Sequence, residues 1–449
     1  MILPTKKILL LGAGRSSSSL IRYLLEASEK NQWQVIIGDV SETAAREKTG
    51  KHTHARAIHF DVNDAVQRMA EVKAADLVIS ILPPHLHYLV AVDCVTCSRH
   101  FLTASYLTPE MQDLHAAAVK NGILILNECG LDPGIDHMSA MEVIHRLQDE
   151  GCELQSFKSY TGGLVAPESN DNPWGYKFSW NPRNVILAGQ GTARYILEGT
   201  YKYIPYNRLF TDIEKIEVGK LGTFDGYANR DSLAYRAHYA IENIPTLLRG
   251  TLRQTGFCRA WDVLVRLGFT DDTYKIEKPE TLTYAQLVRA LLPASAQKPN
   301  LIEAVAAFCN LPPDGEAMSK IIWTGILEED KINLTDATPA MILQHLLEKK
   351  WVLQPHDKDM IVMQHQFVFT RNNKTEKLIS SLVVIGDDQQ FTAMAKTVGL
   401  PLGIAAKLIL ENKISLTGVH IPVKKEIYEP VLKELEQSGI RFTEKNPES

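Results

Sequence analysis

The sequence predicts an α/β fold: a doubly wound parallel sheet, followed by a second α/β domain that carries a small helical insertion. The uninterrupted apolar residues 8–11 are typical of a parallel strand buried on both faces. A Gly-Ala-Gly turn and an amphipathic helical pattern follow this strand directly. Strand and helix patterns then alternate as far as about residue 130, which is the element order of a parallel sheet with helices on both faces.

The turn after the first strand is a candidate dinucleotide site. Gly12 permits a tight turn, and Gly14 lets the backbone approach a pyrophosphate bound at the N-terminus of the following helix. Ala13 lies between the two glycines, and Arg15 and Ser16 add hydrogen-bond donors. The third glycine of the GxGxxG pattern is replaced by serine, so an ordinary strand-to-helix turn is the alternative.

Asp39 ends the second buried strand, about 20–25 residues past the glycines, where a carboxylate accepts hydrogen bonds from the adenosine ribose hydroxyls. A carboxylate here repels a 2′-phosphate, and the nearest arginine is Arg46, so the sequence favours NAD over NADP. The alternative is that Asp39 caps the next helix. Asp61 follows the third strand, where it either approaches the adenine or caps a helix.

Further buried strands are expected at 57–60, 76–82, 100–104 and 123–126. With the first two strands they predict a Rossmann-type dinucleotide-binding domain over residues 1–130. Ligands of such sheets bind at the carboxyl ends of the strands. Leu82 and Ser105 stand at two of these ends.

No metal site is expected. Histidines alternate in two short segments, and we interpret these segments as solvated loops because no cysteine or carboxylate lies at ligand spacing. The Cys94–Cys97 pair has no second pair to complete a zinc site. The histidines concerned are His52, His54, His59, His85 and His87.

From residue 131 the pattern changes to a mixed α/β domain, predicted over 131–253 and 354–390. A helical subdomain is predicted over 254–353. The C-terminal segment, about 391–449, is expected to pack back on the dinucleotide-binding domain. It contains an apolar helical pattern over 392–410 that we expect to be interrupted near 399–403.

The composition narrows the class of protein. A chain of 449 residues suggests two or three domains, and contents of 45% hydrophobic and 22% charged residues are those of a soluble globular protein. A net charge of −5 argues against a nucleic-acid partner. No apolar run approaches a membrane span, and no leader pattern is recognised. Six scattered cysteines fit reduced thiols, so we expect a cytoplasmic protein with no membrane partner.

Several segments after residue 130 offer groups suited to an anionic, flexible small molecule. Lys177, Arg230 and Arg253 provide cations for carboxylates, and nearby aromatic residues provide apolar walls. Each group also has a structural alternative: an ion pair of Arg230 with Asp231, a surface position for Lys177, and core positions for Trp174 and Trp180.

Seven motifs make the chain resemble the saccharopine dehydrogenase family of the L-glutamate-forming type. The resemblance covers fungal stand-alone enzymes and the dehydrogenase half of the animal bifunctional enzyme of lysine degradation. It implies an α/β substrate and dimerisation domain, a homodimer, and oxidation of saccharopine to 2-aminoadipate 6-semialdehyde and L-glutamate. It also implies NAD, because animal members carry an acidic residue where Asp39 stands. The motifs are 130–134, 159–168, 176–180, 229–232, 249–253, 358–363 and 393–401.

The resemblance also implies roles for particular residues. Asp132 is the first candidate for the general acid or base, and Tyr106 is the second. Thr161 stands where the family commonly has a cysteine, which leaves two alternatives open: a related opine-type reductase acting on a different amine, such as a carboxynorspermidine-like enzyme, or a non-catalytic NAD-binding sensor. The implied cofactor contacts are Ala13, Gly14, Asp39, Ile81, Leu82 and Ala104, and the implied substrate contacts are Ser105, Tyr106, Asp132, Arg230, Thr251, Leu252 and Arg253.

Overall fold

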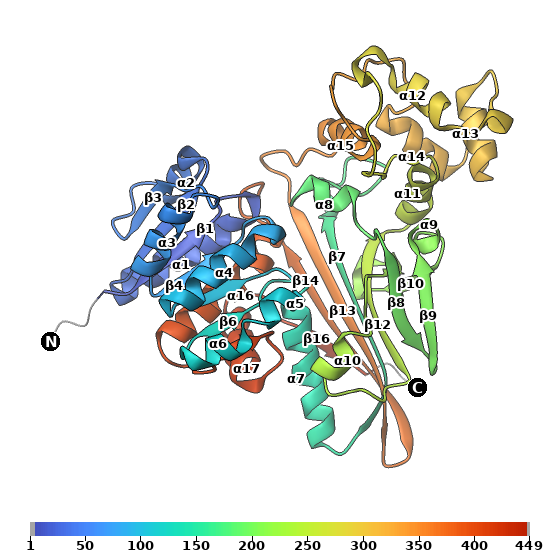
Figure 1. The fold of residues 1–449 in the computed structure, drawn as a ribbon. Coiled ribbons are helices and arrows are strands. Elements are labelled where there is room, and N and C mark those ends of the chain that lie inside the picture. Colours follow the sequence, from blue (N-terminus) through green and yellow to red (C-terminus); the bar gives the residue numbers. More distant parts are fainter. Residues whose placement is uncertain (1–4, 447–449) are drawn as a thin grey trace. The chain divides into compact units, whose positions relative to one another are not determined.

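The computed structural model describes residues 5–446, which form two compact units (Figure 1). The first unit contains the chain up to Glu153 together with Leu382–Thr443, and the second contains Leu154–Ser381. The first unit extends past residue 130 because helix α7 (Ile135–Asp149) packs against α17 (Lys425–Gln437). Residues 254–353, expected as a helical insertion in the second α/β domain, belong to the second unit.

The first unit is built on a seven-stranded sheet in the order β15-β6-β5-β4-β1-β2-β3, whose strand pairs are parallel. This confirms the predicted doubly wound parallel sheet, and β15 adds the C-terminal segment to its edge. The strands are β1 (Lys7–Leu11), β2 (Gln34–Asp39), β3 (Ala55–His59), β4 (Leu77–Ser80), β5 (His100–Thr103), β6 (Leu124–Leu126) and β15 (Gly418–His420).

The apolar side chains of the central strands account for this sheet. In β1 the side chains of residues 8–11 are at most 1% exposed, as expected for a strand covered by helices on both faces. The helices of this unit, besides α7 and α17, are α1 (Ser18–Asn31), α2 (Glu42–Thr49), α3 (Ala65–Ala74), α4 (His87–Cys97), α5 (Pro109–Gln112), α6 (His115–Lys120) and α16 (Ala393–Leu410).

Helix α16 is continuous, so the expected interruption near 399–403 was wrong. The glycines there serve close packing against α1: a Cβ on Gly399 would lie 2.8 Å from the Leu20 backbone nitrogen, and one on Gly403 would lie 2.6 Å from Tyr23 Cδ1. Within the described chain α16 is also long and apolar enough to cross a membrane, but 78% of it is buried inside the protein. Its apolar character is therefore that of a core helix.

The second unit has a nine-stranded sheet in which β10, β11, β12, β7, β13, β14 and β16 follow one another, and β8 and β9 pair beside β12. The pair β12–β7 is parallel, and β10–β11 and β11–β12 are antiparallel. The strands are β7 (Glu153–Val165), β8 (Thr192–Leu197), β9 (Thr200–Pro205), β10 (Ile213–Glu217), β11 (Thr223–Ala228), β12 (Thr246–Gln254), β13 (Asp359–Arg371), β14 (Lys374–Ile385) and β16 (Thr443–Lys445).

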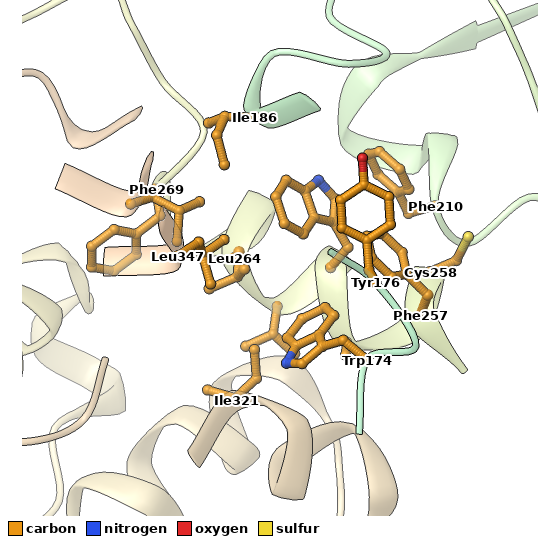
Figure 2. Close-up of a cluster of buried hydrophobic side chains, with 14 of the residues drawn as sticks. Trp174, Tyr176, Ile186, Phe210, Phe257, Cys258, Leu264, Phe269, Ile321 and Leu347 are labelled. Atoms are coloured by element: carbon orange, nitrogen blue, oxygen red, sulfur yellow. The ribbon is translucent and has the colours of Figure 1, made fainter. Parts of the chain in front are cut away.

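Most helices of the second unit gather at one end of its sheet, whereas the short helix α10 lies toward the other end (Figure 1). Figure 2 shows their shared core, in which Trp174 is 1% exposed and packs edge-on against Phe257 and Trp351. The Trp174 indole N–H donates to the Lys320 carbonyl at 2.9 Å. The helices are α8 (Pro182–Ile186), α9 (Tyr206–Leu209), α10 (Tyr235–His238), α11 (Phe257–Arg266), α12 (Tyr284–Leu291), α13 (Leu301–Cys309), α14 (Glu316–Thr324) and α15 (Pro339–Lys350).

Replacing Gly399 by alanine should destabilise the first unit by about 1–3 kcal/mol, because the added methyl group overlaps the α1 backbone. The measurement is urea unfolding followed by circular dichroism. Gly14→Ala is the matched control, since φ at Gly14 is −65° and nothing lies within 4 Å of the place that its added methyl group would take. Equal stability of the two variants would contradict the close contact between α1 and α16.

Candidate functional site

The glycine loop between β1 and α1 has the form of an anion site. Gly12 has a φ of +105°, and a Cβ there would lie 3.0 Å from Ile81 Cγ1. Gly14 is exposed, and a Cβ there would meet nothing within 4 Å. Gly12 is therefore required by the fold of the loop, whereas Gly14 borders open space at the start of a helix, which fits a pyrophosphate.

Asp39 connects this loop to the end of β2. One carboxylate oxygen accepts from the Ala13 N–H at 2.7 Å, and the other accepts from the Ser41 N–H at 2.9 Å. Ser41, not Asp39, caps α2, because its hydroxyl accepts from the Ala44 N–H at 3.3 Å. The helix-cap alternative for Asp39 is thus excluded, and a carboxylate group with two hydrogen bonds has further lone pairs to offer a ligand.

Lys48 is a residue at this site that sequence reasoning missed. Its ammonium group donates to the Ser17 hydroxyl at 2.6 Å and to the Gly14 carbonyl. Burial lowers the pKa of Lys48 to about 8, against the opposing effect of the Asp39 charge. Arg46, which the sequence offered as the nearest arginine, pairs instead with Glu42 on the exposed side of α2.

The remaining predicted cofactor residues lie around the same strand ends. Arg15 is exposed and Ser16 is half-buried in a short 3₁₀ turn, and Leu82 follows β4. Asp61 accepts from the Asn63 backbone N–H at 2.9 Å, and Asp64 caps α3, so Asp61 forms a turn and is not the helix cap.

The interpretation of the histidine segments as solvated loops was wrong for His87, which is buried. It is 3% exposed at the start of α4. Its Nδ1 lies 2.8 Å from the Ser80 hydroxyl, and its Nε2 lies 2.8 Å from the Ser105 hydroxyl and 3.3 Å from that of Thr103. His85, two residues earlier, is exposed. The alternating positions of the two histidines did not reveal that one is exposed and the other buried, because their burial depends on the residue at which α4 begins.

The turn that carries Asp132 packs directly against the end of β5. A Cβ on Gly130 would lie 2.8 Å from the Cβ of Ala104, and the turn closes by a 3.0 Å bond from the Gly130 N–H to the Pro133 carbonyl. Asp132 is half-buried. The structure therefore brings the Asp132 turn next to the segment that contains the other predicted catalytic residue.

Glu128 holds that other segment on both sides of Tyr106. Its backbone N–H donates to the Ser105 carbonyl at 3.0 Å, and its carboxylate accepts from the Leu107 N–H at 2.9 Å. The second carboxylate oxygen lies 2.7 Å from His137 Nε2, and both side chains are almost fully buried. Sequence reasoning did not single out Glu128, although it stands two residues after the end of the buried strand β6.

In the second unit, Thr161, Thr251 and Arg253 lie on one face of the sheet. Thr161 pairs with Thr251 in the parallel register of β7 and β12, and Arg253 is two residues further along β12. Leu252 points to the opposite face, where its Cβ would be 2.8 Å from a Cβ on Gly162. Leu252 is fully buried in the core.

Arg253 is a buried cation in an aromatic setting. It is 5% exposed, and its guanidinium carbon lies 5.3 Å from the ring centre of Tyr176 and 5.4 Å from that of Phe257. Within residues 5–446, no carboxylate lies at ion-pair distance from Arg253, and its Nε has no hydrogen-bond partner. The hydroxyl of Thr161 is likewise buried without a partner among those residues.

Lys177 and Arg230 have different surroundings. The Lys177 ammonium is buried and pairs with Asp171 at 2.8 Å and Asp357 at 2.6 Å. Burial lowers its pKa, but the two hydrogen-bonded carboxylates raise it above the ordinary value. Arg230 is exposed, and the neighbouring Asp231 pairs with Arg194. The substrate roles of Lys177 and Arg230 stay predictions.

The sheet order, the glycine loop and the carboxylate after β2 together define a dinucleotide-binding unit of the Rossmann type. Residues 8–126 match the family described as saccharopine dehydrogenase NADP binding domain, and residues 130–440 match the saccharopine dehydrogenase C-terminal domain. The chain belongs to the saccharopine dehydrogenase family.

Relatives support this assignment over the whole chain. Saccharopine dehydrogenase [NADP(+), L-glutamate-forming] of Pyricularia oryzae is 33% identical over 98% of this chain and 99% of its own length. Apo saccharopine dehydrogenase (L-Glu forming) from Saccharomyces cerevisiae has a similar solved structure, with a TM-score of 0.87, 32% identity and coverage of 99% of this chain and 100% of that one.

The mitochondrial alpha-aminoadipic semialdehyde synthase of Rattus norvegicus is 36% identical over 97% of this chain. The match covers 47% of that relative, so the chain spans about half the length of the animal relatives that it matches.

Burial lowers the pKa of His87 from 6.5 to about 4, with a smaller contribution from His85. Between these values the unfolded chain binds more protons than the folded one, so stability falls as the pH falls through this window. At pH 5 the loss from His87 should be about 1–2 kcal/mol. His87→Asn should lose less stability between pH 7 and pH 5 than His85→Asn, measured by urea unfolding. Equal losses would contradict a buried neutral imidazole.

Proposed function

We propose that the protein catalyses the NAD(P)-dependent oxidation of saccharopine to 2-aminoadipate 6-semialdehyde and L-glutamate, in lysine metabolism. The observation that carries this proposal is the buried Arg253, which has no carboxylate partner within the described chain and lies on one sheet face with the unbonded Thr161 hydroxyl. Burial of an unpaired charge is costly. A bound dicarboxylate or tricarboxylate would satisfy both groups, and saccharopine carries several carboxylates.

The reaction makes defined demands on the chain. A bound nicotinamide would supply the acceptor for the hydride that leaves the lysine-derived ε-carbon next to the secondary amine. The amine must be neutral for its lone pair to form the imine, so a side chain must take its proton. Water then adds to the imine, and a proton must reach the departing glutamate nitrogen as the carbinolamine collapses.

Asp132 is the side chain that we assign to these proton transfers, and Tyr106 is the second candidate. Two features support this assignment: the close packing of Gly130 on Ala104 makes the two segments neighbours, and Glu128 holds both flanks of Tyr106. Thr161 has no useful acidity near pH 7, so the proposal gives it a hydrogen-bonding role and no role as an acid or base.

The cofactor that we propose is NAD, on the strength of Asp39. Its carboxylate lies at the end of β2 beside the glycine loop, where it would accept from the ribose hydroxyls and repel a 2′-phosphate. The names of the fungal relatives and of the family domain point to NADP instead. Lys48 supplies a positive charge at the same loop, so the choice depends on which of these two side chains dominates.

Purified protein should reduce NAD in the presence of saccharopine faster than it reduces NADP, as followed by absorbance of the reduced nicotinamide. Asp39→Ala should lower the preference for NAD over NADP at least about 10-fold, because a charge-assisted bond to the ribose is worth about 1.5–3 kcal/mol. If Asp39→Ala lowered the activity with NAD and with NADP equally, the proposed contact between Asp39 and the ribose would be wrong. Cofactor binding without any reduction would favour the reductase of a different amine, with Thr161 as the position to examine.

Arg253→Lys should lower kcat/KM for saccharopine about 10-fold to 100-fold, because lysine keeps the charge but loses the two-pronged contact with a carboxylate. The dissociation constant of NAD should not change. Arg208→Lys, at an exposed position of the same unit, is the control, and thermal unfolding of both variants checks the fold. If kcat/KM of Arg253→Lys stayed within about twofold of the value for the native protein, the proposal that Arg253 binds a substrate carboxylate would be wrong.

A further inference from the structure

Ser80, His87 and Ser105 form a continuous chain of hydrogen bonds inside the first unit. The imidazole lies 2.8 Å from the hydroxyl of Ser80 and 2.8 Å from that of Ser105, so both ring nitrogens are engaged, and Nε2 also lies 3.3 Å from the Thr103 hydroxyl. Ser80 is fully buried at the end of β4, whereas Ser105 is half-buried just past β5. The chain thus starts at a fully buried hydroxyl in the core and ends at a half-buried hydroxyl.

The strand order places this chain in a particular half of the dinucleotide site. A dinucleotide lies across the point where the strand order reverses, which here is between β1 and β4. The glycine loop and Asp39 belong to the β1–β2 half, which takes the adenosine. The ends of β4 and β5 therefore belong to the nicotinamide half, where the reacting carbon of the substrate must also lie.

The backbone of Ser105 is held independently of its side chain. Its N–H donates to the Thr103 hydroxyl at 3.2 Å, and its carbonyl accepts from the Glu128 N–H at 3.0 Å. With the backbone fixed in this way, the direction of the Ser105 hydroxyl depends on rotation about χ1, and its side-chain hydrogen bond within residues 5–446 is the one to His87. Residue 106, the predicted proton carrier, follows directly.

We propose that His87 is a positioning residue of this enzyme: its imidazole, anchored on Ser80, holds the Ser105 hydroxyl in the orientation that contacts the substrate beside the nicotinamide. The inference rests on the proposed function. A neutral imidazole suits this task because one nitrogen donates while the other accepts, so it joins two hydroxyl groups without adding a charge. Its effect on the reaction passes through Ser105 and not through a proton of its own.

The test replaces His87 by asparagine or by glutamine, because the amide groups of these two side chains take the places of different ring nitrogens. Asparagine places its amide near the position of Nδ1, so His87→Asn keeps the bond to Ser80 and loses the one to Ser105. Glutamine reaches the position of Nε2, so His87→Gln keeps the bond to Ser105. His85→Asn, at the exposed neighbouring histidine, controls for the chemical change.

We expect His87→Asn to lower kcat/KM for saccharopine about 3- to 10-fold, the usual worth of one hydrogen bond. The dissociation constant of NAD, measured by protein fluorescence, should stay within about twofold. His87→Gln should restore most of the activity. In a Ser105→Ala background, His87→Asn should cost nothing further, because the two residues act through one bond. Calorimetric binding of saccharopine in the presence of NADH should show the same pattern.

Two results would overturn the inference while the proposed function stands. One is a His87→Asn variant that matches His85→Asn in both kcat/KM and saccharopine affinity. The other is full additivity of His87→Asn and Ser105→Ala in kcat/KM, which would mean that His87 acts independently of Ser105. If the native protein neither binds nor oxidises saccharopine, the proposed function fails, and the inference fails with it.

Discussion

The parallel pairing of β1 with both β2 and β4 is the interaction on which the candidate site depends. Leu10 pairs with Ile37 on one side and with Ile79 on the other. Because the chain returns to opposite sides of β1, the crossover helices leave a gap at the carboxyl ends of the strands. The glycine loop, Asp39 and Ile81 meet in that gap. A residue that is far away in the sequence, such as Lys48, reaches it only because α2 returns over the loop.

Glycines set how closely the segments around the gap approach. Gly12 lets the loop pass over Ile81, and Gly130 lets the Asp132 turn touch Ala104. Gly162 plays the same part in the second unit, where β7 lies against the side of Leu252. Each contact includes a backbone or Cβ atom, which at Gly12 is the Ile81 carbonyl oxygen, 3.2 Å from the place of an added Cβ, and such atoms cannot move aside as the end of a flexible side chain can. Such positions fix geometry, whereas Gly14 leaves space for a ligand.

Some buried polar groups of the molecule have hydrogen-bonding or ion-pair partners, and others do not. The buried Lys177 ammonium is paired with two carboxylates, and Glu128 and His137 are buried against each other, so these groups stabilise the arrangement of their own segments. Arg253 and Thr161 are buried without equivalent partners in the described chain. Because unmet hydrogen-bonding capacity costs free energy, these two groups are the places in the second unit where a ligand has most to contribute.

Local sequence determined the fold class, the sites of most strands and helices, and the glycine loop with Asp39, because apolar period, glycine turns and strand ends are properties of neighbouring residues. The family, too, could be recognised from contiguous motifs.

The strands over 192–205 and 223–254 were not foreseen, because their mixed polar and aromatic sequences acquire a strand form only by pairing within the sheet. Tertiary structure alone decided that α16 is unbroken, since its glycines are stabilised by contact with α1. It also decided that His87 is buried between two serines while His85 is in solvent. Burial and hydrogen bonding depend on which segments fold over a residue, and no local pattern contains that information.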